Sequence, residues 1–559
     1  MQFSITYKRL AQALLIVGPL ASLAVSPTSN YDPINLIKLL IISSIAFYSL
    51  GLILSSAKFS INRIGKFFWY SAILFVLAML STLLFSGAPI TQQIWGTFGR
   101  NTGFLTYLSL LIILIGTALV QDTNFYEKLI NSFVLTAVPM TVYCIIQYAG
   151  LDPIGWSEKH PFGTLGNINF SSAFFGLTSI CAVALIFEKK FSNAVRASLA
   201  VLVILDLLIV LSTGSIQGFM IFIAGIGLTM YLYIRSNLVL AKFRIAYIFV
   251  ALLGVAVTVL GLSNKGPLAK LLFAPSIVFR TDYWHAGWAM TKSHPIFGVG
   301  LDSYGDWYRS ERGLISTVRT GTDRIANTAH NIFLDISSNG GIPLISAYLA
   351  INIIAFRSVL KVLKRDTKFE PYFVAILSAW FGYLIFSAIS INQVGVGIWG
   401  WLLTGALIGY EITTRNNEIP SEIRLKKVKS KKSAALSPMA GVLGFTGLIS
   451  GFVFSFIPFN ADVKYKDATL SGDFLKVMET TKMLGSTAFH TELALDTAGK
   501  NNFDTQARDL AFQLVKNYPL DFMGWRAISL LKNSSQAERN NALKILRDLD
   551  PYNPDIPKS

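Results

Sequence analysis

The sequence has few charged residues and almost no cysteine. Only 14% of its 559 residues are Asp, Glu, Lys or Arg, whereas soluble domains carry about a quarter. This shortage excludes an ordinary soluble enzyme, and the 53% apolar content excludes intrinsic disorder. The two cysteines, Cys144 and Cys181, both fall inside apolar runs. We therefore expect neither a disulfide framework nor a zinc site with Cys ligands.

Long apolar runs are abundant instead, and their length is typical of helices that cross a bilayer. The predicted fold is an all-α polytopic membrane protein. The first run ends in ASLAVSP, which also resembles a signal-peptide cleavage region, and we expect it to be retained. About thirteen transmembrane helices are expected, at residues 10–27, 36–56, 67–88, 103–120, 129–149, 168–187, 197–212, 217–234, 244–262, 331–356, 371–390, 394–412 and 437–458.

Lys and Arg are distributed unevenly over the loops between these runs. One alternating set of loops carries 24 of them, including Lys58 and the run RLKKVKSKK at 424–432. The short loops of the opposite set carry only Lys38, Arg100 and Lys159. Because positive residues favour the cytoplasmic side, this bias places the N-terminus in the cytoplasm and the C-terminus outside, at a bacterial inner (plasma) membrane. It also explains the net charge of +17 without a nucleic-acid partner.

Two segments are too polar for the membrane, and both are expected outside. A loop at 263–330 interrupts a membrane domain at 1–459, and a tail at 460–559 forms a second domain. The tail has amphipathic helical patterns, and its Pro519 and Trp525 resemble positions of one or two tetratricopeptide repeats. A plain helical hairpin is the alternative. Such a domain offers a docking surface for a protein partner, or it simply packs on the loop.

The loop is rich in arginine and in aromatic residues. Guanidinium groups bind anionic oxygens as fixed forks, and flat aromatic faces stack on sugars or lie at the membrane interface. Together they suggest an anionic lipid head group that carries a glycan, and the alternative is an interfacial helix with snorkelling arginines. The residues concerned are Arg280, Tyr283, Trp284, Trp288, Tyr304, Trp307, Tyr308, Arg309, Arg312, Arg319 and Arg324.

His330 stands just before an apolar run, in AHNIFLD. A neutral imidazole at the outer face can take a proton from an attacking hydroxyl group. The alternative is an interfacial histidine bonded to a helix end. Asp335 lies five residues later and can orient a group at the entrance of the helix. The sequence has no HExxH and no tight carboxylate cluster, so we expect no metal and no other cofactor.

Several of these residues form a recognisable series. It resembles the signature of the O-antigen ligase and O-antigen polymerase superfamily, and the resemblance covers about 90–410. The late elements are Arg280-TDY-Trp284, HPIFGVGLDSY at 294–304, His330-Asn331 and Gly340-Gly341, and the earlier ones are FGRNTG at 98–103 and GTLGNIN at 163–169.

The resemblance implies a metal-independent glycosyltransferase with a GT-C-type helical fold. It implies a polyprenyl-diphosphate-linked glycan as donor, His330 as the base, and Arg280 as a diphosphate ligand. One departure is the turn STGSIQG at 212–218, which lacks an arginine that relatives often carry, so Arg280 or another arginine must do more. Further candidate diphosphate ligands are Arg100, Arg319 and Arg324, and candidate glycan contacts are Tyr283, Trp284, Asn331 and Asn169. Asn169 has helix capping as its alternative role.

The sequence leaves the acceptor open. A lipid A core, another lipid-linked repeat unit and a Ser or Thr of a secreted protein all fit, which correspond to a ligase, a polymerase and a protein O-oligosaccharyltransferase. We expect ligase-like transfer, because the C-terminal domain can present an acceptor. A glycan flippase or transporter is the rival class, but two similar halves are not evident. A membrane scaffold would leave His330 and Arg280 without a role.

Overall fold

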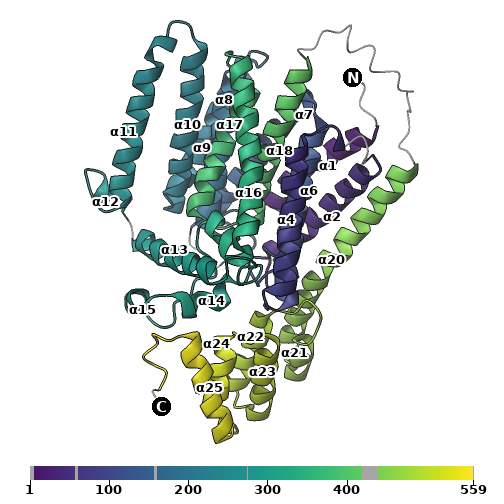
Figure 1. Cartoon of the computed structure of the whole chain (residues 1–559), viewed down its shortest axis with the longest axis vertical. Coiled ribbons are helices and arrows are strands. Elements are labelled where there is room, and N and C mark those ends of the chain that lie inside the picture. Colours follow the sequence, from purple (N-terminus) through teal and green to yellow (C-terminus); the bar gives the residue numbers. More distant parts are fainter. Residues whose placement is uncertain (1–4, 57–60, 157–159, 274, 418–437, 558–559) are drawn as a thin grey trace.

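The computed structural model describes residues 5–56, 61–156, 160–273, 275–417 and 438–557. Within these residues all regular structure is helical and there is no strand, which confirms the expected all-α class (Figure 1). The basic run at 424–432 lies outside the described residues, as do Lys58 and Lys159.

Every predicted span corresponds to a helix. Among the described residues, eleven helices are long and apolar enough to cross a membrane, which confirms a multi-pass membrane protein. Two of the roughly thirteen expected spans are not among these eleven helices. One is α6, a shorter apolar helix of 17 residues, and the other is α1. The helices are α1 (Ile5–Leu23), α2 (Asn35–Leu54), α4 (Lys66–Phe85), α6 (Phe104–Val120), α7 (Thr123–Tyr148), α8 (Ile168–Ile186), α9 (Asn193–Thr213), α10 (Gln217–Ser236), α11 (Arg244–Leu262), α16 (Ile332–Arg365), α17 (Pro371–Ile389), α18 (Val394–Asn417) and α20 (Pro438–Leu470).

The predicted loop at 263–330 is largely helical. α13 lies across the end of the bundle that is opposite the N-terminus, with α14 and α15 beside it (Figure 1). The C-terminal helices lie at this same end. The remaining helices of the membrane part are α5 (Ile90–Trp95), the 3-10 helix η1 (Ala241–Phe243), α12 (Ala269–Leu272), α13 (Pro275–Ser293), α14 (Tyr304–Glu311) and α15 (Leu314–Thr320).

The core of the bundle lies around α6, α8, α17 and α18, whose side chains are mostly buried. Trp399 of α18 stacks on Phe133 of α7, with ring centroids 4.0 Å apart, and its Nε1–H donates to Ser22 Oγ at 2.9 Å. By contrast, α11 is almost wholly exposed and contacts only its neighbours in the sequence, α12, α10 and η1, to any extent. An apolar helix that is exposed all round is suited to contact with lipid.

α20 packs closely along α2, because glycines line the contact. A Cβ atom on Gly447 would collide with the carbonyl oxygen of Phe47, and one on Gly451 with that of Ser43. Small residues allow this close approach of helix backbones in membranes. α20 then continues to Leu470, past the predicted domain boundary at 459, and so carries the C-terminal helices on a continuous helical rod.

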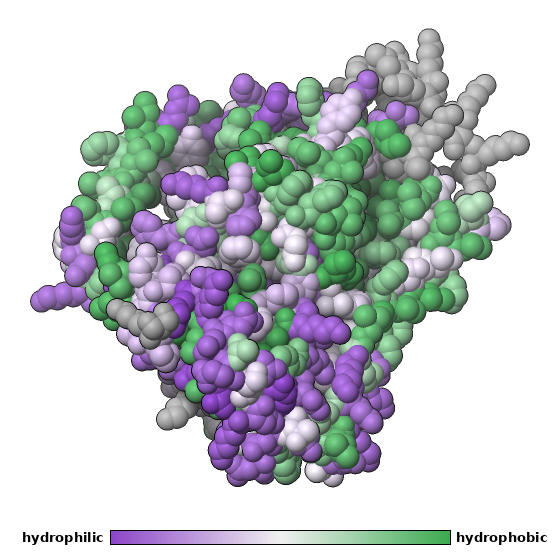
Figure 2. All heavy atoms as spheres, turned by 60° about the horizontal axis from the view of Figure 1, so that its bottom comes forward, coloured by the Kyte–Doolittle hydropathy of each residue, from purple (hydrophilic) through white to green (hydrophobic). Residues whose placement is uncertain are grey.

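The C-terminal helices pack in sequence on one another. Asp521 caps α24 by accepting from the Gly524 N–H at 2.7 Å, and Ser535 forms a capping box with Glu538 at the start of α25. Figure 2 shows hydrophilic residues gathered over this end of the molecule and hydrophobic ones on the flanks of the bundle. The helices are α21 (Phe474–Thr480), α22 (Ala488–Lys500), α23 (Asp504–Asn517), α24 (Phe522–Leu530) and α25 (Gln536–Leu549).

A buried polar joint connects these helices to the membrane part. The His490 Nε2 atom lies 2.9 Å from Asp462 Oδ1, and both side chains are almost fully buried. Asp462 Oδ2 accepts from the backbone N–H groups of Tyr31 and Asp32 at 2.7 and 3.1 Å. Since α22, α20 and the segment between α1 and α2 all meet here, the joint fixes the C-terminal helices against the bundle.

Lys38, an exception to the predicted charge bias, has a structural role. Its side chain is fully buried, and Nζ donates to the carbonyl oxygens of Ala21, Ser22 and Ala24 at 2.8, 3.0 and 3.0 Å. A buried ammonium group requires such partners. The lysine therefore closes the C-terminal end of α1 rather than facing solvent.

Candidate functional site

The loop at 294–300 is inserted into a break in α16. Gly341 has φ 71°, a left-handed conformation that glycine adopts without strain, and it interrupts the helix. The Val299 N–H donates to the carbonyl oxygen of Ser338 at 2.9 Å, and the Ile342 N–H donates to that of Pro295 at 2.8 Å. The predicted elements HPIFGVG and Gly340-Gly341 are thus in direct backbone contact, and together they hold the first turns of α16.

Asp302 connects this loop to the FGRNTG element at 98–103. Its Oδ2 accepts from the Thr97 N–H at 2.8 Å, and its Oδ1 accepts from Thr102 Oγ1 at 2.9 Å. Arg100 Nε lies 3.5 Å from Asp302 Oδ1, and both side chains are largely buried. Two elements about 200 residues apart in the sequence therefore form one unit.

His330 occupies a strained turn immediately before α16. Its φ is 51°, which is uncommon for a residue with a side chain. The turn is held by the Ala329 N–H, which donates to Asp335 Oδ1 at 2.7 Å, and by the His330 N–H, which donates to Thr328 Oγ1 at 3.1 Å. Asp335 thus orients the entrance of the helix. Asn331 caps α16, because its Oδ1 accepts from two backbone N–H groups of the first turn.

The imidazole of His330 is half-buried and neutral at ordinary pH. Burial, together with the positive charges of Arg280 and Arg100, lowers its pKa to about 4. The ring lies beside Tyr283, with centroids 5.3 Å apart. A neutral imidazole keeps a lone pair that can accept a proton.

α13 carries Arg280, Tyr283 and Trp284, of which Tyr283 lies beside the ring of His330 and Arg280 acts on it through its charge. Burial lowers the pKa of Arg280, and no carboxylate among the described residues lies within ion-pair distance of it. The buried Nε1–H of Trp284 likewise has no hydrogen-bond partner in the described part of the chain. A half-buried guanidinium group without a counter-ion is a site that an anion would stabilise.

The other loop arginines differ in their partners. Arg309 and Arg312 pair with Asp550 at 3.0 and 2.7 Å, and Arg312 and Asp550 are fully buried. Arg319 Nη1 lies 3.0 Å from Asp282 Oδ1. Arg324 is exposed, and its guanidinium carbon lies 4.8 Å from the ring centroid of Phe279. Nothing in the sequence indicated this ion-pair role for Asp550, which lies in LDPYNP at 549–554, near the end of the repeat-like tail.

Asn169 lies in a different contact network from His330. Its Oδ1 accepts from Ser215 Oγ at 2.7 Å, so the GTLGNIN element is joined to the turn at 212–218. The helix cap of α8 is Asn167, not Asn169. In the turn itself the Oε1 atom of Gln217 is buried and has no partner among the described residues.

Arg100 lines a polar cleft of about 240 Å³ at the edge of the bundle. Asn167, Asn392 and Gln393 also face it. Asn392 Oδ1 and Gln393 Nε2 are buried without a hydrogen-bond partner in the described residues. Sequence reasoning missed these two amides, although a polar INQ between two apolar runs was a visible signal.

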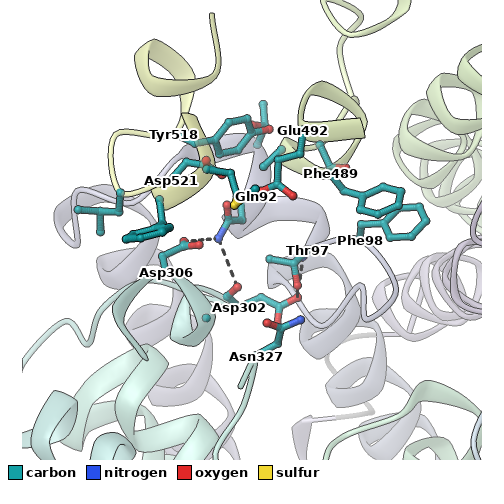
Figure 3. Close-up of a pocket in the computed structure, with 18 of the residues that line it drawn as sticks. Gln92, Thr97, Phe98, Asp302, Asp306, Asn327, Phe489, Glu492, Tyr518 and Asp521 are labelled. Carbon is teal, nitrogen blue, oxygen red and sulfur yellow. Dashed lines mark hydrogen bonds between the residues drawn. The ribbon is translucent and has the colours of Figure 1, made fainter. Parts of the chain in front are cut away.

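A larger cavity of about 380 Å³ lies on the other side of Asp302, between the loop and the C-terminal helices (Figure 3). Asp302 and Asn327 belong to its wall, and the latter lies three residues before His330. Across the described parts of the chain, no three His, Cys, Asp or Glu side chains are grouped as a metal ion would require.

The comparison with protein families agrees with this arrangement. Residues 199–349 match the model of the O-antigen ligase family. The matched segment begins within α9, ends just after the break in α16, and includes Arg280 and His330. No curated protein matches the chain significantly. The family match implies glycosyltransferase-like activity of the ligase or polymerase kind, with a lipid-linked glycan donor and a glycan acceptor. It confirms the resemblance found in the sequence: over residues 199–349 this multi-pass membrane protein is similar to the O-antigen ligase family.

Proposed function

We propose that the protein transfers a glycan from a polyprenyl-diphosphate-linked donor to an external acceptor, in the manner of an O-antigen ligase. The observation that carries the proposal is the pairing of a neutral His330 with a half-buried Arg280 that has no carboxylate partner in the described residues. The first group suits a general base and the second suits an anionic leaving group.

The chemistry needs two functions. The acceptor hydroxyl oxygen forms a bond to the anomeric carbon of the donor glycan, and the bond from that carbon to the diphosphate oxygen breaks. The hydroxyl proton passes to the imidazole of His330, and the diphosphate leaves with its lipid. Arg280 stabilises the negative charge that develops on the leaving oxygen. These two residues supply both functions, so we propose a transfer that requires no metal.

Other residues assist in the binding of the donor. Arg100 adds a second positive charge near His330, and the cleft that it lines can receive part of the diphosphate or the first sugar. Arg324 is free to turn from the Phe279 ring to a phosphate, whereas Arg319 would first have to leave Asp282. Arg280 is therefore the principal ligand in this proposal.

The glycan contacts follow from the aromatic and amide groups. Tyr283 lies beside the imidazole, and Trp284 has a free indole N–H for a sugar oxygen. Asn331 uses its Oδ1 for helix capping, so its amide N–H₂ group is the part that can reach a sugar. Asn169 would contact the glycan only at the side of the 212–218 turn.

The setting is proposed from the charge bias. The loop helices and the C-terminal helices at 460–559 lie at one end of the molecule, opposite the N-terminus (Figure 1). We place this end on the outer side of a bacterial inner membrane, with the membrane domain at 1–459. We infer a ligase-type acceptor. A polymerase and a protein O-oligosaccharyltransferase of the same superfamily differ from it only in the acceptor.

The test is glycan transfer by the full-length protein in detergent, with EDTA present and a polyprenyl-diphosphate oligosaccharide as donor. Lipid A core, lipid-linked glycan and peptide acceptors are offered in parallel. Wild type should transfer to one class of acceptor, and His330→Ala should not. Unchanged transfer by His330→Ala would refute the role of His330 as the general base. His294→Ala, which changes a histidine of the same loop, is the matched control.

A further inference from the structure

The cavity between the loop and the C-terminal helices has walls from three parts of the chain. Gln92 of α5 and Phe98 form one wall, Asp306 of α14 forms another, and Phe489 and Glu492 of α22 close it from the C-terminal side (Figure 3). Its volume of about 380 Å³ lies within the range of about 300–1,000 Å³ that is typical of small-molecule sites.

The lining combines aromatic rings with hydrogen-bonding groups. Phe98 and Phe489 are stacked with centroids 3.9 Å apart, and Tyr518 lies across the cavity from them (Figure 3). The Gln92 Nε2–H donates to Asp306 Oδ2 at 2.7 Å, which leaves the Oδ1 atom for another donor. Flat aromatic faces and planar carboxyl or amide groups are the surfaces to which sugar C–H faces and hydroxyl groups bind.

The ionisable groups that line the cavity differ from the arginines around His330. Asp306, Glu492 and Asp521 line it, and the guanidinium of Arg309 is already engaged by Asp550. Burial raises the pKa of Asp306 to about 7, and burial together with the neighbouring Asp521 raises that of Glu492. Arg309, already paired, is the only Lys or Arg among the described lining residues, so the wall offers no free cation to a diphosphate and the cavity is not a second site for the donor.

We propose that this cavity binds the acceptor of the transfer reaction, as a neutral or amine-bearing saccharide. This inference rests on the proposed function, because it assigns the second substrate of the same reaction. The aromatic groups stack on the sugar ring, and Asp306 and Glu492 hydrogen-bond to its hydroxyl or amine groups.

The cavity adjoins the candidate catalytic residue through two connections. Asn327 lines it and lies in the same short segment as His330. Asp302 also lines it and pairs with Arg100, whose charge acts on the imidazole of His330. The Arg100–Asp302 pair therefore separates a basic side, suited to the diphosphate, from an acidic and aromatic side, suited to the acceptor.

The first experiment measures saccharide binding by the full-length protein in detergent, using calorimetry. The probes are a neutral oligosaccharide, a glucosamine oligosaccharide and a uronic-acid oligosaccharide. Glu492→Ala removes a hydrogen-bonding group, and Met523→Trp fills the cavity from an exposed position in its wall. Glu479→Ala is the matched control, because Glu479 is exposed and lies outside the cavity.

Wild type should bind the neutral or the amine-bearing probe, and bind the acidic probe at least tenfold more weakly. Glu492→Ala should weaken the favoured binding about tenfold, which is at the upper end of what one hydrogen bond contributes. Met523→Trp should weaken it to a similar extent by filling the cavity, and the control should not weaken it. Absence of binding by wild type, or equal binding by wild type and both cavity variants, would overturn the proposal.

The transfer assay separates this proposal from the function on which it rests. Glu492→Ala should raise the acceptor KM about tenfold and leave the donor KM within twofold of wild type. An unchanged acceptor KM, together with transfer that still depends on His330, would overturn the cavity as the acceptor site and leave the function intact. Saccharide binding that depends on Glu492, without any transfer by wild type, would overturn the proposed reaction instead.

Discussion

The arginines of the external loop form two groups that differ in their partners. Arg309 and Arg312 share the buried carboxylate of Asp550, and they attach the end of the chain to the loop. Arg280 lies beside His330, half-buried and without a carboxylate partner in the described residues. Residue type and location in the loop therefore do not decide the role of an arginine. Its role depends on whether a carboxylate lies beside it, and for Arg312 that carboxylate comes from a residue more than 200 positions away.

Removing the carboxylate that Arg309 and Arg312 share should have the largest effect. Asp550→Ala leaves Arg312 buried without a counter-ion, which should lower the free energy of unfolding of the C-terminal region by about 3–5 kcal/mol. Thermal unfolding of the purified protein, followed by tryptophan fluorescence, measures this loss. The control is Asp548→Ala, which removes an exposed carboxylate two residues earlier and should unfold as wild type does. Identical unfolding of the two variants would contradict the structural role.

A smaller effect is expected when the unpaired Arg280 and the paired Arg319 are each replaced by alanine. Arg280→Ala should lower kcat/KM for glycan transfer by about 10²–10³-fold, because one preorganised charge on the leaving group is lost. Arg319→Ala should lower it less than about tenfold, because its guanidinium is already engaged by Asp282. Steady-state transfer rates with varied donor give both values. The reverse order would show that Arg319 leaves its partner and binds the diphosphate.

The smallest effect concerns pH. The pKa of His330 is lowered to about 4 from 6.5 by burial and by Arg280 and Arg100. The active neutral imidazole should therefore persist as the pH falls from 7 to about 5, and kcat/KM for the donor should decline only near pH 4. The measurement is made at a saturating concentration of acceptor, so that titration of Asp306 and Glu492 in the cavity does not change the measured kcat/KM for the donor. An acid limb centred near pH 6.5 would show that the imidazole is not held in this environment.

The membrane helices were predictable because the length of an apolar run is a local signal. Each run of apolar residues became a helix. The backbone contact between HPIFGVG and Gly340-Gly341 was not predicted. The series around His330 also predicted the family, as the match at 199–349 confirms. The apolar runs and this series depend on neighbours in the sequence, which is why the sequence alone was sufficient.

The partners of the charged groups were not predictable. Asp302 holds Thr97 and Arg100, and Asp550 holds Arg312, across separations of about 200 residues or more. Such contacts depend on how the helices pack, and no periodic pattern encodes them. The same holds for the cavity wall, where Glu492 meets Asp306 only because α20 carries the C-terminal helices back to the loop.

The central claim is that Arg280 holds the diphosphate and His330 performs the proton transfer. The most direct measurement is donor binding by wild type, Arg280→Ala and His330→Ala in detergent, with transfer followed in the same samples. The account predicts that His330→Ala binds the polyprenyl-diphosphate donor as tightly as wild type and transfers nothing, while Arg280→Ala loses most of the binding. Equal loss of donor binding in both variants, or transfer by His330→Ala at the rate of wild type, would contradict it.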